Sequence, residues 1–433
     1  MIILLLFGSL TFIMALGMPV AFSFLLVDLI AMYFVIGSNA PLQLIASIFD
    51  SLTKFTLTPI PFFILMGEIL FHSGLAKRLL SAIDSLLGRL PGRLAVLSII
   101  SGTIFASLSG SVVANTVLLG SLLLPDMLER GYDRRFAIGS IMASGSLTMM
   151  MPHSTLIIIF ATIAMIPVGS LLIAGLIPGL IIASLYFIYT VGRCIHNPSL
   201  APKPKCVENS ITESVLVMFF RDVLPLLAII IGTILVISLG VATPTEAAAL
   251  GAFFSVILVA IYGKLSKDVV KKSTSTTIYI SAMLLFIMAG SAGFSQVLAF
   301  SGASQGLLGA VLGMNLSPSM VIISMLIIVF FIAMFMEESA IIMVTTPIFM
   351  PVILAMHVNP IWFGVLMLMM LEKGLITPPA GLLLYVAKGI APKEITTWDI
   401  WMSTIPYVLC ILVAIILVFF YPQLATILIL KSV

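Results

Sequence analysis

Small polar residues gather at one point of an otherwise apolar segment. Ser109, Gly110 and Ser111 stand in a row, and Asn115 follows four positions later. Hydroxyl, amide and carbonyl oxygens can replace the hydration shell of a cation, and helix ends expose such carbonyls. The same small residues also let membrane helices pack closely. The segment is therefore a candidate sodium site, with helix packing as the alternative.

Ionisable residues inside apolar segments indicate a second candidate site. Glu337 and Glu338 lie in one such segment, and Glu372 and Lys373 lie in the next. A charge at the centre of a membrane helix costs about 2.5 kcal/mol or more, so it is usually paired or functional. We interpret Lys373 as a candidate ligand for an anionic substrate and His153 as a hydrogen-bond donor to the same cavity. The alternatives are a neutralised structural pair and a structural histidine.

An internal repeat brings these candidates into register. Pro125 corresponds to Pro351 (351 − 125 = 226), and Pro152 corresponds to Pro378 at the same offset. Pro152 and Pro378 each interrupt an apolar segment, because proline lacks a backbone donor and disfavours helix at the preceding residue. The sequence therefore predicts two broken helices, each preceded by a re-entrant helical hairpin.

The two copies differ in the charge of their loops. Loop 76–93 contains four lysines or arginines and loop 130–135 contains three, whereas loops 303–317 and 356–362 contain none. Lysine and arginine are enriched in cytoplasmic loops. The loops of one copy are therefore expected to face the cytoplasm and those of the other to face outward. Inverted repeats of this kind are typical of secondary transporters, which bind substrate and ions near the membrane midplane.

Composition excludes a soluble globular protein. Hydrophobic residues make up 61% of the 433 residues and charged residues 9%, and the mean hydropathy is +1.28. Apolar runs long enough to cross a hydrocarbon core of about 30 Å recur along the chain. We therefore predict an all-α polytopic protein of the lipid bilayer. The net charge of +3 belongs to loop lysines and arginines and gives no reason to expect a nucleic-acid partner.

The polar stretch 193–222 divides the chain and is predicted to be a cytoplasmic linker. Non-helical backbone at membrane depth must be buried in protein or line a cavity, so hairpin tips and helix breaks should meet at one site. The predicted regions are N-terminal scaffold helices (1–75); a first transport repeat (76–192) with a hairpin at 94–128 and a broken helix at 134–165; the linker (193–222); second scaffold helices (223–300); and a second transport repeat (301–433) with a hairpin at 320–354, a broken helix at 360–388 and a C-terminal helix.

Other function classes are less compatible with the sequence. It contains no G-x-x-x-x-G-K-[ST] loop, so ATP is not expected to be the energy source. A polytopic membrane enzyme is one alternative, but the sequence contains no HExxH motif to support it. An ion channel is a further alternative, but inverted hairpins with polar tips suit alternating access better than a continuous pore.

Seven stretches in order across nearly the whole chain form a specific set of motifs. They are Gly17-Met-Pro-Val-Ala-Phe22, Ile60-Pro-Phe-Phe-Ile-Leu-Met-Gly-Glu68, Ser109-Gly-Ser-Val-Val-Ala-Asn115, Gly131-Tyr132, Ala174-Gly-Leu-Ile-Pro-Gly179, Thr243-Pro-Thr-Glu-Ala-Ala-Ala249 and Gly374-Leu-Ile-Thr-Pro-Pro-Ala-Gly381. Together they resemble the large membrane subunit of tripartite ATP-independent periplasmic (TRAP) transporters. The resemblance implies an elevator-type sodium symporter of a bacterial inner membrane, working with a small four-helix membrane subunit and a periplasmic substrate-binding protein.

The resemblance also implies roles for individual residues. His153 and Lys373 depart from the pattern of many members and leave carboxylates and sulfonates open as substrates; a sodium and anion symporter that needs no binding protein is the alternative. The first sodium site would comprise Ser109, Gly110, Ser111, Asn115, Gly145 and Ser146, the second Glu337, Ser339, Gly374, Thr377 and Pro378, and the substrate cavity His153, Ser154, Glu338 and Lys373.

The inverted repeat predicts on which side of the membrane four positions lie. Single cysteines at Arg78, Arg134, Gln305 and Asn359 are to be introduced in a background without the three native cysteines. A membrane-impermeant thiol reagent added to intact spheroplasts should label only positions 305 and 359, because loops without lysine or arginine face outward. Labelling of all four positions from one side would contradict the inverted repeat.

Overall fold

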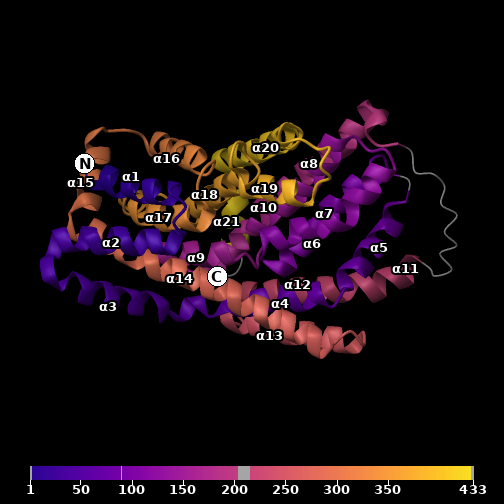
Figure 1. The fold of residues 1–433 in the computed structure, drawn as a ribbon, viewed down its shortest axis with the longest axis horizontal. Coiled ribbons are helices and arrows are strands. Elements are labelled where there is room, and N and C mark those ends of the chain that lie inside the picture. Colours follow the sequence, from indigo (N-terminus) through magenta and orange to yellow (C-terminus); the bar gives the residue numbers. More distant parts are fainter. Residues whose placement is uncertain (1, 89, 203–214, 431–433) are drawn as a thin grey trace.

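The computed structural model describes residues 2–88, 90–202 and 215–430, which form a bundle of α-helices (Figure 1). Within these ranges, nine helices are long and apolar enough to cross a membrane. The predicted all-α polytopic class is therefore confirmed. Arg89 lies outside the described residues. So do residues 203–214 of the predicted linker, which include Cys206.

The first half of the chain runs from the N-terminus to a long helix that ends at His196. α4 begins at Pro59, where the missing N–H of proline costs nothing because the first turn of a helix has no acceptor for it. The helices are α1 (Ile2–Ala15), α2 (Val20–Ile36), α3 (Ala40–Leu52), α4 (Pro59–His72), α5 (Leu75–Leu87), α6 (Arg93–Ser109), α7 (Val112–Glu129), α8 (Arg134–Ser146), α9 (Thr155–Ala164) and α10 (Val168–His196).

The second half begins with a short helix that continues through a π-helical turn, Phe219–Val223. Three of its later helices, α13, α16 and α18, again start at a proline, and the side chain of the preceding residue caps each of them. The helices are α11 (Val215–Met218), α12 (Leu224–Ser238), α13 (Pro244–Ile261), α14 (Lys267–Phe300), α15 (Ala303–Gly313), α16 (Pro318–Ile332), α17 (Glu338–Ala355), α18 (Pro360–Leu375), α19 (Leu382–Ile390), α20 (Thr397–Phe420) and α21 (Gln423–Leu430).

The helix bounds reproduce the sequence repeat. α17 begins and ends 226 residues after α7 (338 − 112 and 355 − 129), and α18 begins 226 residues after α8 (360 − 134). The pairs α6–α7 and α16–α17 are the two hairpins. The first interrupted helix consists of α8 and α9, and the second of α18 and α19. Residues 147–154 and 376–381, which contain the prolines, form the two breaks. The grouping of helices into scaffold and transport regions stays a prediction.

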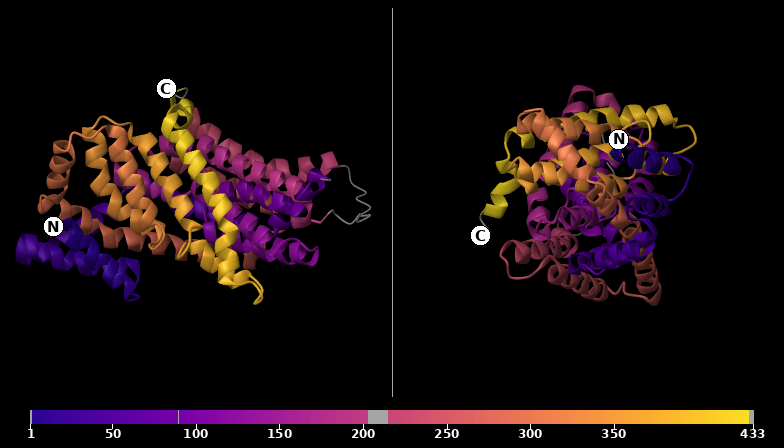
Figure 2. Two further views of the ribbon diagram at one scale, coloured as in Figure 1. Left: turned by 90° about the horizontal axis from the view of Figure 1, so that it is seen from above. Right: turned by 90° about the vertical axis from the view of Figure 1, so that its left-hand side faces the viewer.

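The two repeats exchange contacts rather than packing separately. α9 of the first copy packs against α17 of the second, and α19 of the second packs against α7 of the first. In the same way, α8 packs against α20, and α18 against α10. Segments far apart in the sequence therefore lie side by side in the middle of the bundle, as the end-on view in Figure 2 also shows. The protein core is consequently shared by both copies.

The loops of the two copies lie at opposite ends of the long axis. α5 is found at one end of the molecule, and α15 at the other (Figures 1 and 2). Near the end with basic loops, Arg135 Nε lies 2.8 Å from a carboxylate oxygen of Asp399. At the other end, the indole N–H of Trp362 donates to the carbonyl of Val418 at 2.9 Å. This arrangement is what an inverted repeat requires.

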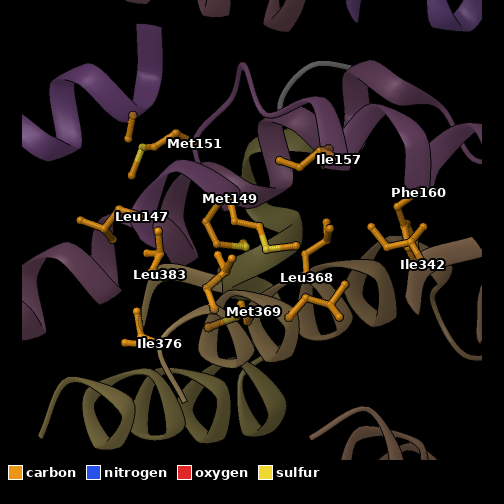
Figure 3. Close-up of a cluster of buried hydrophobic side chains, with 14 of the residues drawn as sticks. Leu147, Met149, Met151, Ile157, Phe160, Ile342, Leu368, Met369, Ile376 and Leu383 are labelled. Atoms are coloured by element: carbon orange, nitrogen blue, oxygen red, sulfur yellow. The ribbon is translucent and has the colours of Figure 1, made fainter. Parts of the chain in front are cut away.

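The space between the two breaks is filled by apolar side chains. Met149 from the first break, Leu368 and Met369 from α18 and Leu383 from α19 belong to one buried cluster (Figure 3). Methionine is unbranched and flexible, so it fills the irregular space left where helices are interrupted. Polar groups near the breaks are thus surrounded by a dry and closely packed core.

Candidate functional site

The tip of the first hairpin lies directly against the first break. Gly110 joins α6 to α7 with φ of +57°, in the left-handed region, and a Cβ there would stand 2.8 Å from the carbonyl oxygen of His153. Ser111 caps α7, because its hydroxyl accepts a hydrogen bond from the backbone N–H of Ala114 at 3.3 Å. The tip and the break can approach this closely only because position 110 has no side chain.

A second glycine lets α4 cover the same tip. A Cβ on Gly67 would lie 2.3 Å from the Cα of Ser109, which is a backbone atom and cannot rotate away. Ser109 is consequently buried, and its hydroxyl lies 3.4 Å from the N–H of Ser111, which donates to it. The tip is therefore covered by α4 at Ser109, whereas the non-helical residues Gly110 and Ser111 are half-buried.

Asn115 presents a free oxygen beside this tip. Its side chain is buried, and its Nδ2 donates to the carbonyls of Gly102 at 3.2 Å and Ser144 at 3.3 Å. Those two oxygens only accept hydrogen bonds, so the amide nitrogen must face them. Oδ1 is then left without a hydrogen-bond partner among the described residues. A buried amide oxygen without a donor is an available ligand for a cation.

Gly145 brings α8 close to α7 at the level of Asn115. A Cβ at this position would stand 1.8 Å from the hydroxyl oxygen of Thr116. Its carbonyl accepts a hydrogen bond from the hydroxyl of Thr148 at 2.9 Å, at the start of the break. The structure thus brings together Ser109, Gly110, Ser111, Asn115 and Gly145 of the predicted first site. The hydroxyl of Ser146, which was also predicted to belong to this site, points toward Glu372 instead.

The second hairpin tip also meets its own break. A Cβ on Gly374 would lie 2.8 Å from the carbonyl oxygen of Ala333, which follows α16. Glu337 caps α17 by accepting from the N–H of Ala340 at 3.1 Å and from the hydroxyl of Ser339. The hydroxyl of Thr377 donates to the carbonyl of Lys373 at 2.6 Å. Of the predicted second site, the structure places Gly374 against the start of the tip, and Glu337 and Ser339 against each other at the start of α17; Glu337 already has two donors.

Lys373 is a fully buried cation that faces an aromatic ring. Its Nζ lies 3.1 Å from the centroid of the Phe330 ring. Within the described residues, this Nζ has no hydrogen-bond partner and no carboxylate within 4.0 Å. A cation over a ring face is stabilised by about 0.5–2 kcal/mol. Lys373 therefore does not form the structural ion pair that was one alternative, with either Glu372 or Glu338. Glu338 is nevertheless buried as well.

His153 is held by partners on both ring nitrogens. Nε2 lies 2.8 Å from the hydroxyl of Thr233 on α12, and Nδ1 contacts the carbonyl of Ser107 on α6. The ring centroid is 4.7 Å from that of Phe63, and the side chain is fully buried. These contacts connect the first break to α6, α4 and α12. Ser154, which precedes α9, is also buried.

Glu372, which the sequence marked as an ionisable residue in an apolar segment, has a partner that the sequence analysis did not identify. The hydroxyl of Ser146 donates to its Oε1 at 3.4 Å and lies 3.3 Å from the hydroxyl of Tyr186. Ser146 and Glu372 are 226 positions apart (372 − 146), so they occupy equivalent places in the two copies. Equivalent residues touch only near the axis that relates the copies. The offset alone could have singled out this pair.

The chemistry of these positions is that of hydroxyl, amide and carbonyl oxygens. The described residues contain no group of three or more histidine, cysteine, aspartate or glutamate side chains that could hold a metal ion. Transition metals prefer imidazole and thiolate ligands, whereas hard cations prefer oxygen. The arrangement therefore fits a hard cation bound mainly by neutral oxygen ligands.

Comparison with known proteins identifies the family. Residues 7–424 match the family model described as tripartite ATP-independent periplasmic transporter, DctM component. A C4-dicarboxylate TRAP transporter large permease protein of Rhodobacter capsulatus is 31% identical over 98% of this chain and 97% of its own length. The ectoine TRAP transporter large permease protein of Halomonas elongata is 29% identical over 95% of both chains.

Two further matches concern chain organisation and fold. The isethionate TRAP transporter permease protein DctMQ of Oleidesulfovibrio alaskensis is 31% identical over 90% of this chain, which covers 61% of that longer protein. The crystal structure of the YdaH transporter of Alcanivorax borkumensis has a similar fold, with a TM-score of 0.65, 18% identity and 90% coverage of both chains. The chain is thus a large membrane subunit of the TRAP transporter family, a multi-pass protein of the bacterial inner membrane.

Proposed function

We propose that this permease imports a small organic anion, a carboxylate or a sulfonate, together with sodium ions. The observation that carries the sodium part is the free Oδ1 of Asn115, buried where the first tip meets the first break. Sodium binding there would replace a missing hydrogen-bond donor with a cation. We assign Ser109, Gly110, Ser111, Asn115 and Gly145 to the first site; Ser146, which the sequence also placed there, directs its hydroxyl toward Glu372 instead.

The second repeat supports a second sodium position. Gly374 and the tip residue Ala333 are in contact, so a carbonyl of the tip lies against the last turn of α18, just before the second break. We assign Glu337, Ser339, Gly374, Thr377 and Pro378 to this position. An elevator movement, in which the hairpins and interrupted helices shift together, is proposed as the transport mechanism because each tip is in contact with its own break.

Lys373 is proposed as the residue that recognises the negative charge of the substrate. A buried ammonium that contacts only a ring face can accept an anion without first breaking an ion pair. Two relatives are named for C4-dicarboxylate and for isethionate. The first compound carries carboxylate groups and the second a sulfonate group, which fits a carboxylate or a sulfonate as the substrate. We also propose Ser154 and Glu338 at the cavity. His153 would act there by positioning the break.

The transport system is proposed to need two more components. TRAP transporters are tripartite, and this chain matches the component that the family model describes as DctM. The DctMQ relative has more than a third of its length outside the match, room for a small membrane subunit fused to the permease. We therefore expect a small four-helix membrane subunit and a periplasmic substrate-binding protein to work with this chain, without ATP.

Uptake by the reconstituted system tests the proposal. Proteoliposomes that contain this chain and the small subunit should accumulate substrate only with an inward sodium gradient and added binding protein. Ser109→Ala and Asn115→Ala should weaken the sodium dependence of uptake, whereas Ser121→Ala, which changes an exposed serine on the same helix as Asn115, should not. Equal uptake with a proton gradient alone, or without the binding protein, would contradict the proposed function.

Lys373→Met is expected to abolish uptake and leave the protein folded. The lost cation–π contact, about 0.5–2 kcal/mol, is smaller than the cost of burying an ammonium, about 2.5–3.5 kcal/mol. The unfolding temperature in detergent should therefore equal or exceed that of the wild type. Lys373→Arg keeps the charge and should retain some uptake at lower affinity. Wild-type uptake by Lys373→Met would show that substrate does not need this charge.

A further inference from the structure

Glu372 is an acidic side chain in the middle of the core whose charge is not balanced. Its side chain is fully buried, and within the described residues Oε2 has no hydrogen-bond partner. Oε1 receives one long hydrogen bond, 3.4 Å, from the hydroxyl of Ser146. The neighbouring Lys373 does not compensate, because its Nζ faces the Phe330 ring. A carboxylate in this setting requires a cation, since burying an unpaired charge is costly.

The unsatisfied Oε2 is the atom at which a cation can bind. A carboxylate oxygen only accepts hydrogen bonds, and no donor lies within hydrogen-bond distance of Oε2 in the described residues. A cation bound at Oε2 satisfies this oxygen and also neutralises the charge. A proton would remove the charge as well, so the experiment below compares the two cases.

Tyr186 completes the polar group around Glu372. Its hydroxyl lies 3.3 Å from that of Ser146, whose oxygen is 3.4 Å from Oε1 of Glu372 and 3.0 Å from the carbonyl of Ala143. Several oxygen atoms therefore lie close together here. The side chains of Tyr186, Ser146 and Glu372 are fully buried. They come from α10, α8 and α18, which belong to both copies of the repeat. We propose that Glu372, Ser146 and Tyr186 form a separate sodium site on the axis between the two repeats.

This third site differs from the two predicted sodium sites in its origin. Each of those is formed within one copy, by a tip and its own break. The axial site is formed only when α8 and α18 lie side by side, because Ser146 is the last residue of α8 and Glu372 lies in the last turn of α18. A cation there would link the two interrupted helices. This inference rests on the sodium coupling proposed above.

Thermal unfolding of the full chain in detergent tests the axial site. Sodium chloride replaces choline chloride at constant ionic strength, and wild type is compared with Glu372→Gln. The variant should need about tenfold more sodium for half of its stabilisation, since it loses a charged ligand. Without sodium it should unfold at a higher temperature than wild type, because the unbalanced charge is gone. Plots of unfolding temperature against sodium concentration for wild type and Glu372→Gln should therefore cross.

Two tyrosine variants provide a matched control. Tyr186→Phe removes the hydroxyl next to Ser146 and should raise the sodium midpoint several-fold. Tyr407→Phe removes an equally buried hydroxyl that contacts Thr190 at 3.3 Å instead, and should leave the midpoint unchanged. Parallel curves for wild type and Glu372→Gln, as expected of a protonated carboxyl, or equal sodium midpoints, would overturn the axial site. A wild type indifferent to sodium would overturn both this inference and sodium coupling.

Discussion

The interrupted backbone at the centre of the bundle is the constraint on which the other features depend. A membrane helix that stops before it crosses exposes carbonyls and amides that lipid cannot satisfy. Here each interruption is covered by the tip of its own hairpin, with Gly110 against the carbonyl of His153 and Gly374 against the carbonyl of Ala333. Both contacts need a residue without a Cβ. Covering the breaks with short polar tips also places oxygen ligands in a dry core.

Charge is distributed unequally around this constraint. Glu372 and Lys373 are adjacent in the sequence but face different elements, Ser146 on α8 and Phe330 on α16. An ion pair between Glu372 and Lys373 would have neutralised both side chains and left neither free to bind an ion. Because they are separated, neither side chain is neutralised by the other, which leaves each free to bind an ion of opposite charge in the co-transport proposed above.

Much of the architecture could be predicted from the sequence. The offset of 226 residues located both hairpins and both interrupted helices, because proline and loop charge are local signals. The exchange of contacts between the copies, α9 with α17 and α19 with α7, could not be predicted, since no local pattern encodes pairing between distant segments. His153 was predicted to face substrate, whereas its nitrogens contact Thr233 and Ser107. The partners of His153 lie on other helices, and no spacing in the sequence predicts such contacts.

Amide hydrogen exchange in sodium and in choline tests the central claim most directly, that tips and breaks together form cation sites. Residues 109–115, 147–154, 333–339 and 376–381 lie at helix ends, in a short 3-10 turn or outside helices, so their amides exchange through local opening. If they bind sodium, exchange in these four segments should slow in sodium and be unchanged in α2, α3 and α13. Exchange that is the same in both salts, or slowed equally across the whole chain, would contradict the account.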